Sequence, residues 1–244
     1  MSINVSASAL SLLDSCPRCF WFDRIEKRPR PRGIFPSLPG GFDKIIKTYM
    51  DGFRRELKLP PELAEKQMLE KGYILFDDQA KMDRMRNWRT GLKVAHGVEC
   101  ALIGALDDLL YIPEKHVFAP LDYKTKGSPT SAEDALKYYQ RQLDCHDLLL
   151  MKNGFPTNHE AFLLYFSPDA MYEIGNCHMH TQIITIQTDP ARAESLLEDA
   201  SDILSMDKPP APAIDCEYCE FVQDRITFSA VETFQKQAEK ATGE

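Results

Sequence analysis

The sequence has 244 residues, of which 43% are hydrophobic and 27% are charged. This composition is typical of globular proteins and excludes a disordered, collagen-like or coiled-coil chain. No apolar run approaches the ~18 residues that a membrane span requires, and the first ten residues lack the basic segment of a signal peptide, so we expect a soluble, cytoplasmic protein with no membrane partner. The net charge of −8 argues against a nucleic-acid partner. However, basic residues are in excess over residues 1–100 and acidic residues over 101–244, so the overall charge does not decide the matter.

The first third of the chain predicts helices and one basic loop. Apolar spacing predicts a helix over residues 6–25, which Pro17 kinks or interrupts. Residues 26–41 are rich in Pro, Gly and Arg and predict a loop. Amphipathic helices are expected over residues 42–57 and, behind two prolines, over 62–70.

The pattern then changes to short extended stretches. Residues 92–125 predict three adjacent strands in a β-meander. A long helix is expected over 131–152, strands over 160–166 and 180–187, and a last helix behind Asp189, which acts as its N-cap. This order predicts an α/β fold with a mixed sheet.

We expect one domain over residues 1–244. Its parts are a helical, basic N-terminal part (1–90), a core (91–190), and a C-terminal helix with a cysteine tail (191–244).

Four of the seven cysteines form two C-x-x-C pairs, Cys16 with Cys19 and Cys216 with Cys219. An odd count without a secretory signal argues against a disulfide framework. Four thiolates suit either a structural zinc ion or a [4Fe–4S] cluster. A shared site would join the first helix to the tail. The alternatives are unrelated buried thiols or a redox pair.

A second set of residues points to metal-dependent hydrolysis. Asp122 and Lys124 lie two residues apart on a predicted strand and therefore share one face. Asp107 interrupts an apolar stretch one strand earlier, where a carboxylate is costly unless it is paired or binds a metal. Glu99 and His96 are further candidate ligands, with an ordinary polar surface role as the alternative.

The order of these motifs resembles the PD-(D/E)XK nuclease superfamily, in particular its RecB-like branch, which includes the nuclease domains of RecB and AddB and the CRISPR-associated RecB-like exonucleases. The matching residues are a G-x-x-D ending at Asp107, the D-x-K of Asp122 and Lys124, and a helical Gln142. The opening Ser6-x-Ser8-x-Leu10 with Cys16-Pro17, and the late cysteines, are similar to this branch as well.

The resemblance implies a restriction-endonuclease-like αβββαβ core with an iron–sulfur staple, so that the expected centre at the four cysteines is a [4Fe–4S] cluster, with a zinc ion as the alternative. It implies that Asp107 and Asp122 bind Mg²⁺ or Mn²⁺, that Lys124 is the catalytic lysine, and that Gln142 faces the site. His146 stands where the family has a tyrosine and, with three arginines of the first loop, is a candidate DNA contact. The three arginines are Arg28, Arg30 and Arg32.

Two other departures from the family pattern concern metal ligands. The cysteines are divided two and two, where the branch has one early and three late. The upstream metal-binding histidine has no direct counterpart, and Asp43 or His96 are the candidates to replace it.

The expected function is therefore a DNA nuclease, specifically an exonuclease acting on ends or single strands. Its partners would be DNA and a helicase or another recombination, CRISPR or phage protein. The alternative is a non-catalytic nucleic-acid- or protein-binding module that keeps the nuclease fold and a four-cysteine metal staple.

Overall fold

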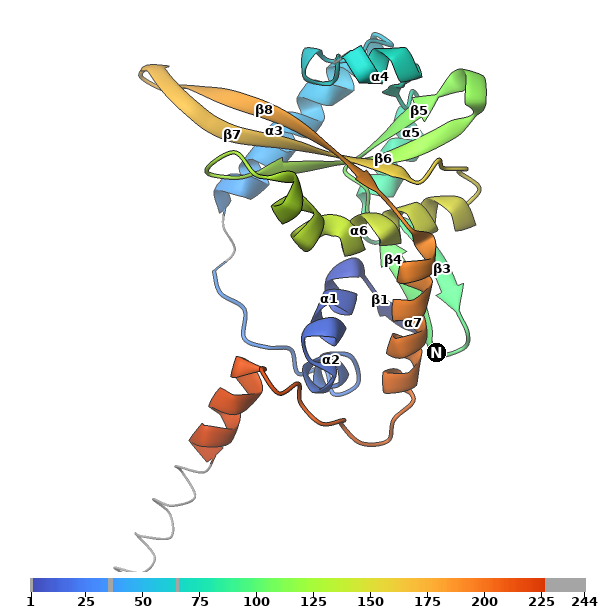
Figure 1. Ribbon diagram of the computed structural model, residues 1–244, viewed down its shortest axis with the longest axis vertical. Helices are drawn as coiled ribbons and strands as arrows, with labels where there is room; N and C mark the ends of the chain where they lie inside the picture. Colours follow the sequence, from blue (N-terminus) through green and yellow to red (C-terminus); the bar gives the residue numbers. More distant parts are fainter. Residues whose placement is uncertain (1, 35–36, 65, 227–244) are drawn as a thin grey trace, which may run out of the picture.

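The computed structural model describes residues 2–34, 37–64 and 66–226. Its strands form two sheets, and Figure 1 shows the longer one above a tier of helices. The three-stranded sheet has the order β1 (Ile3–Val5), β4 (Cys100–Gly104), β3 (Leu92–His96). The five-stranded sheet has the order β2 (Ile74–Leu75), β5 (Asp108–Ile112), β6 (Val117–Thr125), β7 (Glu160–Glu173), β8 (Asn176–Gln187). Both sheets are mixed, since β1 is parallel to β4 and β6 is parallel to β7.

The helices cover the two sheets and fill the space between them (Figure 1). They are α1 (Ala7–Ser15), α2 (Pro17–Arg24), α3 (Ser37–Arg55), α4 (Lys66–Lys71), α5 (Gln79–Arg86), α6 (Ala132–Lys152) and α7 (Pro190–Leu204), with two short 3-10 turns, η1 (Pro61–Leu63) and η2 (Pro113–Lys115). Helix also covers residues 217–226. The predicted α/β class with a mixed sheet and a cysteine staple is confirmed, whereas the division into three parts stays a prediction.

The predicted β-meander is wrong. Residues 92–125 form four strands divided between two sheets, because the chain leaves the first sheet after Gly104 and enters the second at Asp108. A Cβ on Gly104 would come within 2.5 Å of Leu149 Cδ1 on α6. The glycine therefore lets α6 pack closely at the point where the chain changes sheet.

Helix α6 is the central element and contacts strands of both sheets. Its N-cap is Ser131, whose side chain accepts a hydrogen bond from the Asp134 N–H. The helix ends at Asn153, followed by Gly154 with φ +84°, as predicted. Every residue from 143 to 150 is buried, so this helix has little freedom to rotate. The helical residues just before 143 are therefore held in a fixed orientation.

The N-terminal segment and the tail meet below α6. The predicted helix over residues 6–25 is two helices, because the extended backbone at Cys16 and the ring of Pro17 start a new one. Asp189 caps α7 as predicted, its side chain accepting from the Ala191 N–H. Strands β7 and β8 are longer than predicted and form a hairpin that projects beyond the sheet (Figure 1).

Candidate active site and cysteine centre

Asp122 and Lys124 lie on the central strand β6 and face α6. The Lys124 Nζ is 2.6 Å from Asp122 Oδ2. Gln142 of α6 connects both, since its amide donates to Asp122 Oδ1 at 2.6 Å and its oxygen accepts from Lys124 Nζ at 3.2 Å. The period of two along β6 thus places the acid and the amine against one helical side chain.

Asp107 joins this group from the link between the two sheets. Its Oδ2 accepts a hydrogen bond from the backbone N–H of Tyr123, at 3.1 Å, and so it lies beside the peptide that follows Asp122. The apolar stretch that contains Asp107 bends out of one sheet before entering the other, which leaves this carboxylate at the bend and not inside a strand.

Helix α3 adds two residues, of which the sequence pointed only to Asp43. Lys47 Nζ lies 2.8 Å from Asp107 Oδ1 and 2.8 Å from Asp43 Oδ1, one helical turn earlier. Asp43 was a candidate replacement for the family's upstream histidine, and the structure brings it to the edge of the cluster. Lys47 carried no motif signal, although it lies one turn after Asp43 on the same face of the helix.

A buried charge network continues along that face of α3. Asp108 is fully buried and accepts two bonds from Arg54 Nη2, at 2.5 and 2.6 Å, one from Arg86 Nη2 at 2.9 Å and one from the Tyr123 hydroxyl at 2.5 Å. Arg86 Nε also donates to the Asp107 carbonyl at 2.7 Å. The network therefore fixes the backbone on both sides of the candidate site.

The two carboxylates differ in their proton affinity. Burial raises the pKa of Asp122 to about 6, and the negative charge of Asp107 acts in the same direction against the opposing charge of Lys124. Burial would also raise the pKa of Asp107, but the charge of Lys47 and its hydrogen bond outweigh burial and lower it. Asp107 therefore holds its proton less tightly than Asp122 does.

His146 lies one turn after Gln142 and is 5% exposed. Its Nδ1 has no hydrogen-bond partner, and burial lowers the pKa of its ring to about 4, so it is neutral at pH 7. His146 and Gln142 line a cavity of about 330 Å³ together with Ser6, Ser8 and Tyr138. The opening motif of the chain and the helix of the active-site glutamine therefore share one cavity.

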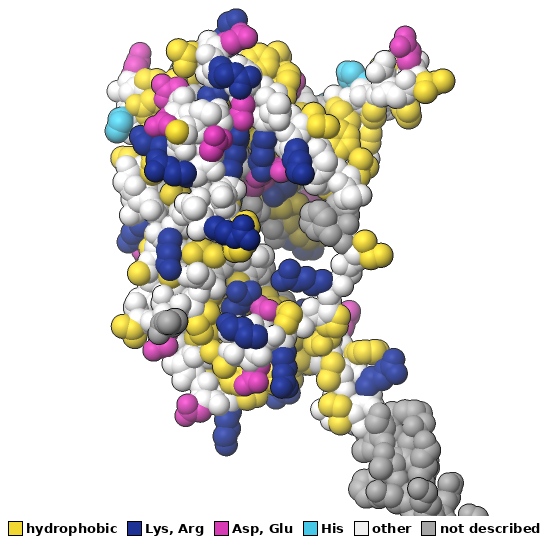
Figure 2. Space-filling model, turned by 180° about the vertical axis from the view of Figure 1, so that it is seen from behind, with side chains coloured by type: hydrophobic (Ala, Val, Ile, Leu, Met, Phe, Trp, Pro, Cys, Tyr) yellow, Lys and Arg dark blue, Asp and Glu magenta, His cyan; other side chains and the backbone are white. Residues whose placement is uncertain are grey.

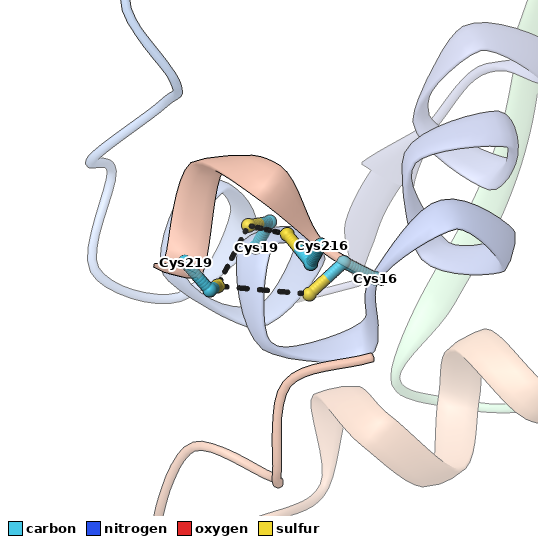
Figure 3. Close-up of side chains that lie close together, drawn as sticks. All are labelled: Cys16, Cys19, Cys216 and Cys219. Atoms are coloured by element: carbon cyan, nitrogen blue, oxygen red, sulfur yellow. Dashed lines mark hydrogen bonds between the residues drawn. The ribbon is translucent and has the colours of Figure 1, made fainter. Parts of the chain in front are cut away.

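The four C-x-x-C cysteines meet at the contact between α2 and the tail (Figure 3). Their sulfurs all lie within 4.8 Å of one another, with Cys16–Cys219 at 3.9 Å, Cys19–Cys216 at 3.8 Å and Cys19–Cys219 at 3.5 Å. Burial would raise the pKa of the Cys16 thiol, but hydrogen bonds from the Ala213 and Cys19 backbones and from neighbouring thiols lower it to about 6. This favours the thiolate form of Cys16, the form that binds metals, whereas burial raises the pKa of the Cys19 and Cys219 thiols.

A family model described as the PD-(D/E)XK nuclease superfamily matches residues 4–223. The chain belongs to this superfamily. None of the curated proteins compared with the chain matches it. Members of the superfamily are nucleases that generally use divalent metal ions, so Asp107, Asp122, Lys124 and Gln142 lie together in a protein of nuclease ancestry.

The side chains of a PD-(D/E)XK site that are present here fit Mg²⁺ or Mn²⁺. Both metals prefer oxygen ligands, and Mg²⁺ is commonly held by one or two carboxylates together with waters and substrate phosphates. Asp107 and Asp122 could supply these carboxylates. Asp122 Oδ2 is buried without a hydrogen-bond donor in alignment, although the Lys124 ammonium lies close by, which leaves one carboxylate oxygen with lone pairs to offer.

Two predicted ligands lie elsewhere. His96 ends β3, and Glu99 precedes β4 in the turn between these strands. Asp107 follows the other end of β4, so the five residues of that strand, ~16 Å of extended chain, separate the turn from the carboxylate cluster. The structure thus places Glu99 and His96 away from the other candidate ligands, which favours the ordinary polar surface role that the sequence also allowed, because closeness in sequence is not closeness in space.

One predicted DNA contact is also directed elsewhere. Arg30 Nη2 donates to Cys216 Sγ at 3.1 Å, and its guanidinium lies over the Tyr218 ring at 5.7 Å. Its positive charge is thus used at the cysteine centre. Arg28 and Arg32 are exposed on the same loop and remain available to a phosphate backbone.

Proposed function

We propose that this protein is a metal-dependent DNA nuclease of the RecB-like branch, acting as an exonuclease on DNA ends or single strands. The observation that carries the proposal is the convergence of Asp107, Asp122, Lys124 and Gln142, which come from a loop, a strand and a helix of a PD-(D/E)XK chain. The cytoplasmic location remains a prediction from the sequence.

The chemistry requires an attacking water and stabilisation of the charge that develops on the phosphate. A bound Mg²⁺ or Mn²⁺ would supply Lewis acidity and a more acidic water. Asp107 and Asp122 would hold that ion. The Lys124 ammonium lies beside Asp122, where it can orient the water or stabilise the developing negative charge. Gln142 contacts both Asp122 and Lys124 and thus keeps the amine and the carboxylate in register.

A DNA strand would pass from the cluster of Asp107, Asp122, Lys124 and Gln142 into the cavity beside it. Gln142 contacts Asp122 and also lines the 330 Å³ cavity, together with Ser6, Ser8 and His146, whose Nδ1 has no hydrogen-bond partner. These groups suit phosphate or sugar oxygens. Lys and Arg side chains spread over the face seen in Figure 2, around a hollow near its centre. Contacts of such side chains with the phosphate backbone of DNA do not read the base sequence. A helicase or another recombination, CRISPR or phage protein would deliver the end.

At the cysteine centre the spacing of the sulfurs favours one tetrahedral ion. Four thiolates at ~2.3 Å from a zinc ion stand about 3.8 Å apart; three of the sulfur pairs are 3.5, 3.8 and 3.9 Å apart, and all four sulfurs lie within 4.8 Å of one another. In a [4Fe–4S] cluster each thiolate binds a different iron, which sets the sulfurs further apart. Zinc is therefore the better fit of the two metal centres that the sequence allowed.

A second candidate function is a non-catalytic nucleic-acid-binding module. It is favoured by the ion pair between Lys47 and Asp107, which balances the charge of this carboxylate from within the chain.

One experiment separates the two functions. The full chain is incubated with Mg²⁺ or Mn²⁺ and with single- and double-stranded DNA labelled at either end, beside Asp122→Asn and Lys124→Met. The nuclease predicts cutting by the parent only, with mononucleotide or short products from one end. Binding of DNA without cutting by the parent would establish the module instead.

A further inference from the structure

We propose that Lys47 is an internal cation that neutralises the metal-binding carboxylates until a divalent ion displaces it, and that the displaced ammonium then binds the phosphate of the nucleic-acid strand. This inference rests on the proposed nuclease function and deepens it. It assigns to the active site a residue of α3 that no motif of the family indicates.

The first argument is the choice of oxygen. Asp107 Oδ2 is already engaged by the backbone N–H of Tyr123, at 3.1 Å. The other oxygen, Oδ1, accepts no backbone hydrogen bond in the described part of the chain and is the one that a metal would bind. Lys47 Nζ lies 2.8 Å from this oxygen. The ammonium and a divalent cation therefore compete for the same atom.

The second argument is the balance of charge. Three carboxylates, Asp43, Asp107 and Asp122, face two ammonium groups, Lys47 and Lys124, so the cluster carries one net negative charge. A divalent cation makes it +1, and one phosphodiester restores neutrality. The positive charges of both Lys47 and Lys124 are thus needed once the nucleic-acid strand is bound. However, Lys47 cannot stay beside Asp107 Oδ1 when a doubly charged ion takes that place.

The third argument is freedom of movement. The Lys47 side chain is 22% exposed and extends from α3 on four flexible carbons. Asp43, 41% exposed at its side chain, stays within reach one turn earlier and can hold the amine while it moves. Asp43 of α3 and residues Tyr123 to Thr125 of β6 line a hollow of about 310 Å³ next to this point, which is space for the displaced ammonium and a phosphate.

The test is to measure Mn²⁺ binding to the full chain by electron paramagnetic resonance, without DNA, for the parent, Lys47→Met and Lys47→Gln. We expect about tenfold tighter Mn²⁺ binding by both variants, because a competing positive charge is removed. The matched control is Lys44→Met, an exposed lysine three residues earlier on α3, which should bind Mn²⁺ as the parent does. Circular dichroism establishes that each variant is folded, and the conservative Lys47→Gln serves if the methionine is not tolerated.

The second readout has the opposite sign. Binding of a single-stranded oligonucleotide in Ca²⁺, measured by fluorescence anisotropy, should be about tenfold weaker for Lys47→Met and unchanged for Lys44→Met. Mn²⁺ binding that is equal or weaker in both Lys47 variants would overturn the inference, even if the parent cuts DNA. A parent that binds Mn²⁺ more weakly than the Lys47 variants but cuts no DNA would overturn the nuclease proposal and leave the role of Lys47 as a competing cation in place.

Discussion

Arg54 and Asp108 form an ion pair whose side chains are both fully shielded from solvent, with Nη2 2.5 Å from Oδ1. Asp108 adjoins the proposed metal ligand Asp107 in the chain, and its other partners, Arg86 and Tyr123, also touch the backbone or side chain of Asp107. The pair thus links the stability of the core to the geometry of the candidate site.

Removing one partner should therefore be costly. Arg54→Met leaves Asp108 buried with one fewer cation and is expected to lower the free energy of unfolding by about 3–5 kcal/mol. The double variant Arg54→Met with Asp108→Asn should recover part of this loss, because no uncompensated charge remains. Urea titration followed by circular dichroism measures both. Equal stability of Arg54→Met and the parent would contradict a stabilising role of the pair in the fold.

Gln142 is predicted to act as a positioning residue for Asp122 and Lys124. Gln142→Leu removes both hydrogen bonds and should lower kcat by about 10–100-fold. The KM for DNA should change little, because a residue that positions Asp122 and Lys124 is not required for holding the DNA backbone. Gln142→Glu, which retains the acceptor for Lys124, should retain more activity than the leucine variant. A rise in KM at constant kcat would instead assign Gln142 to DNA binding.

The buried ring of His146 predicts a dependence of stability on pH. Its pKa is about 4 in the folded protein and ~6.5 in the unfolded chain, so the unfolded state takes up the proton first. Its contribution is fully present above pH 6.5 and is lost as the pH falls toward 4. Between pH 7.5 and 5 the loss is about 2 kcal/mol. Urea titrations measure the free energy of unfolding of the parent and of His146→Phe at both pH values. Between these pH values the parent should lose about 2 kcal/mol more than His146→Phe, and an equal loss in both proteins would refute the assignment.

The cysteine centre predicts one bound metal ion for each chain. Elemental analysis should find zinc, and the protein should be colourless, whereas a brown protein with iron and absorption near 400 nm would overturn the single-ion assignment. Cys16→Ser and Cys219→Ser should each reduce the metal content and the thermal stability, because the centre connects α2 to the tail. Ser15→Ala, next to Cys16 and exposed, is the matched control and should keep the metal.

The contact of Arg30 with Cys216 predicts that retention of the metal depends on a positive charge beside the cysteines. Arg30→Gln removes the donor to Cys216 and a positive charge beside the thiolates, so release of the metal to a chelator should be several-fold faster. The exposed Arg32→Gln, two residues along the same loop, should release it as the parent does. Equal release from Arg30→Gln and the parent would show that the guanidinium does not stabilise the thiolates.

The sequence by itself determined the features that depend on neighbours in the chain. The long helix α6 and its glycine stop, the Asp189 cap and the break at Pro17 follow from local patterns, and all are present in the structure. The alternation that places Asp122 and Lys124 on one face is equally local. The two C-x-x-C pairs were recognisable as pairs for the same reason.

Only the tertiary structure decided which of these residues meet. The apolar stretch around Asp107 reads as one strand, yet it is interrupted between Gly104 and Asp108, where the chain passes from one sheet to the other. This bend sets Asp107 beside β6, leaves Glu99 at the far end of β4, and brings Lys47 from a helix much earlier in the chain. Such contacts depend on where the chain reverses and packs, which the periodicity of a short segment does not record.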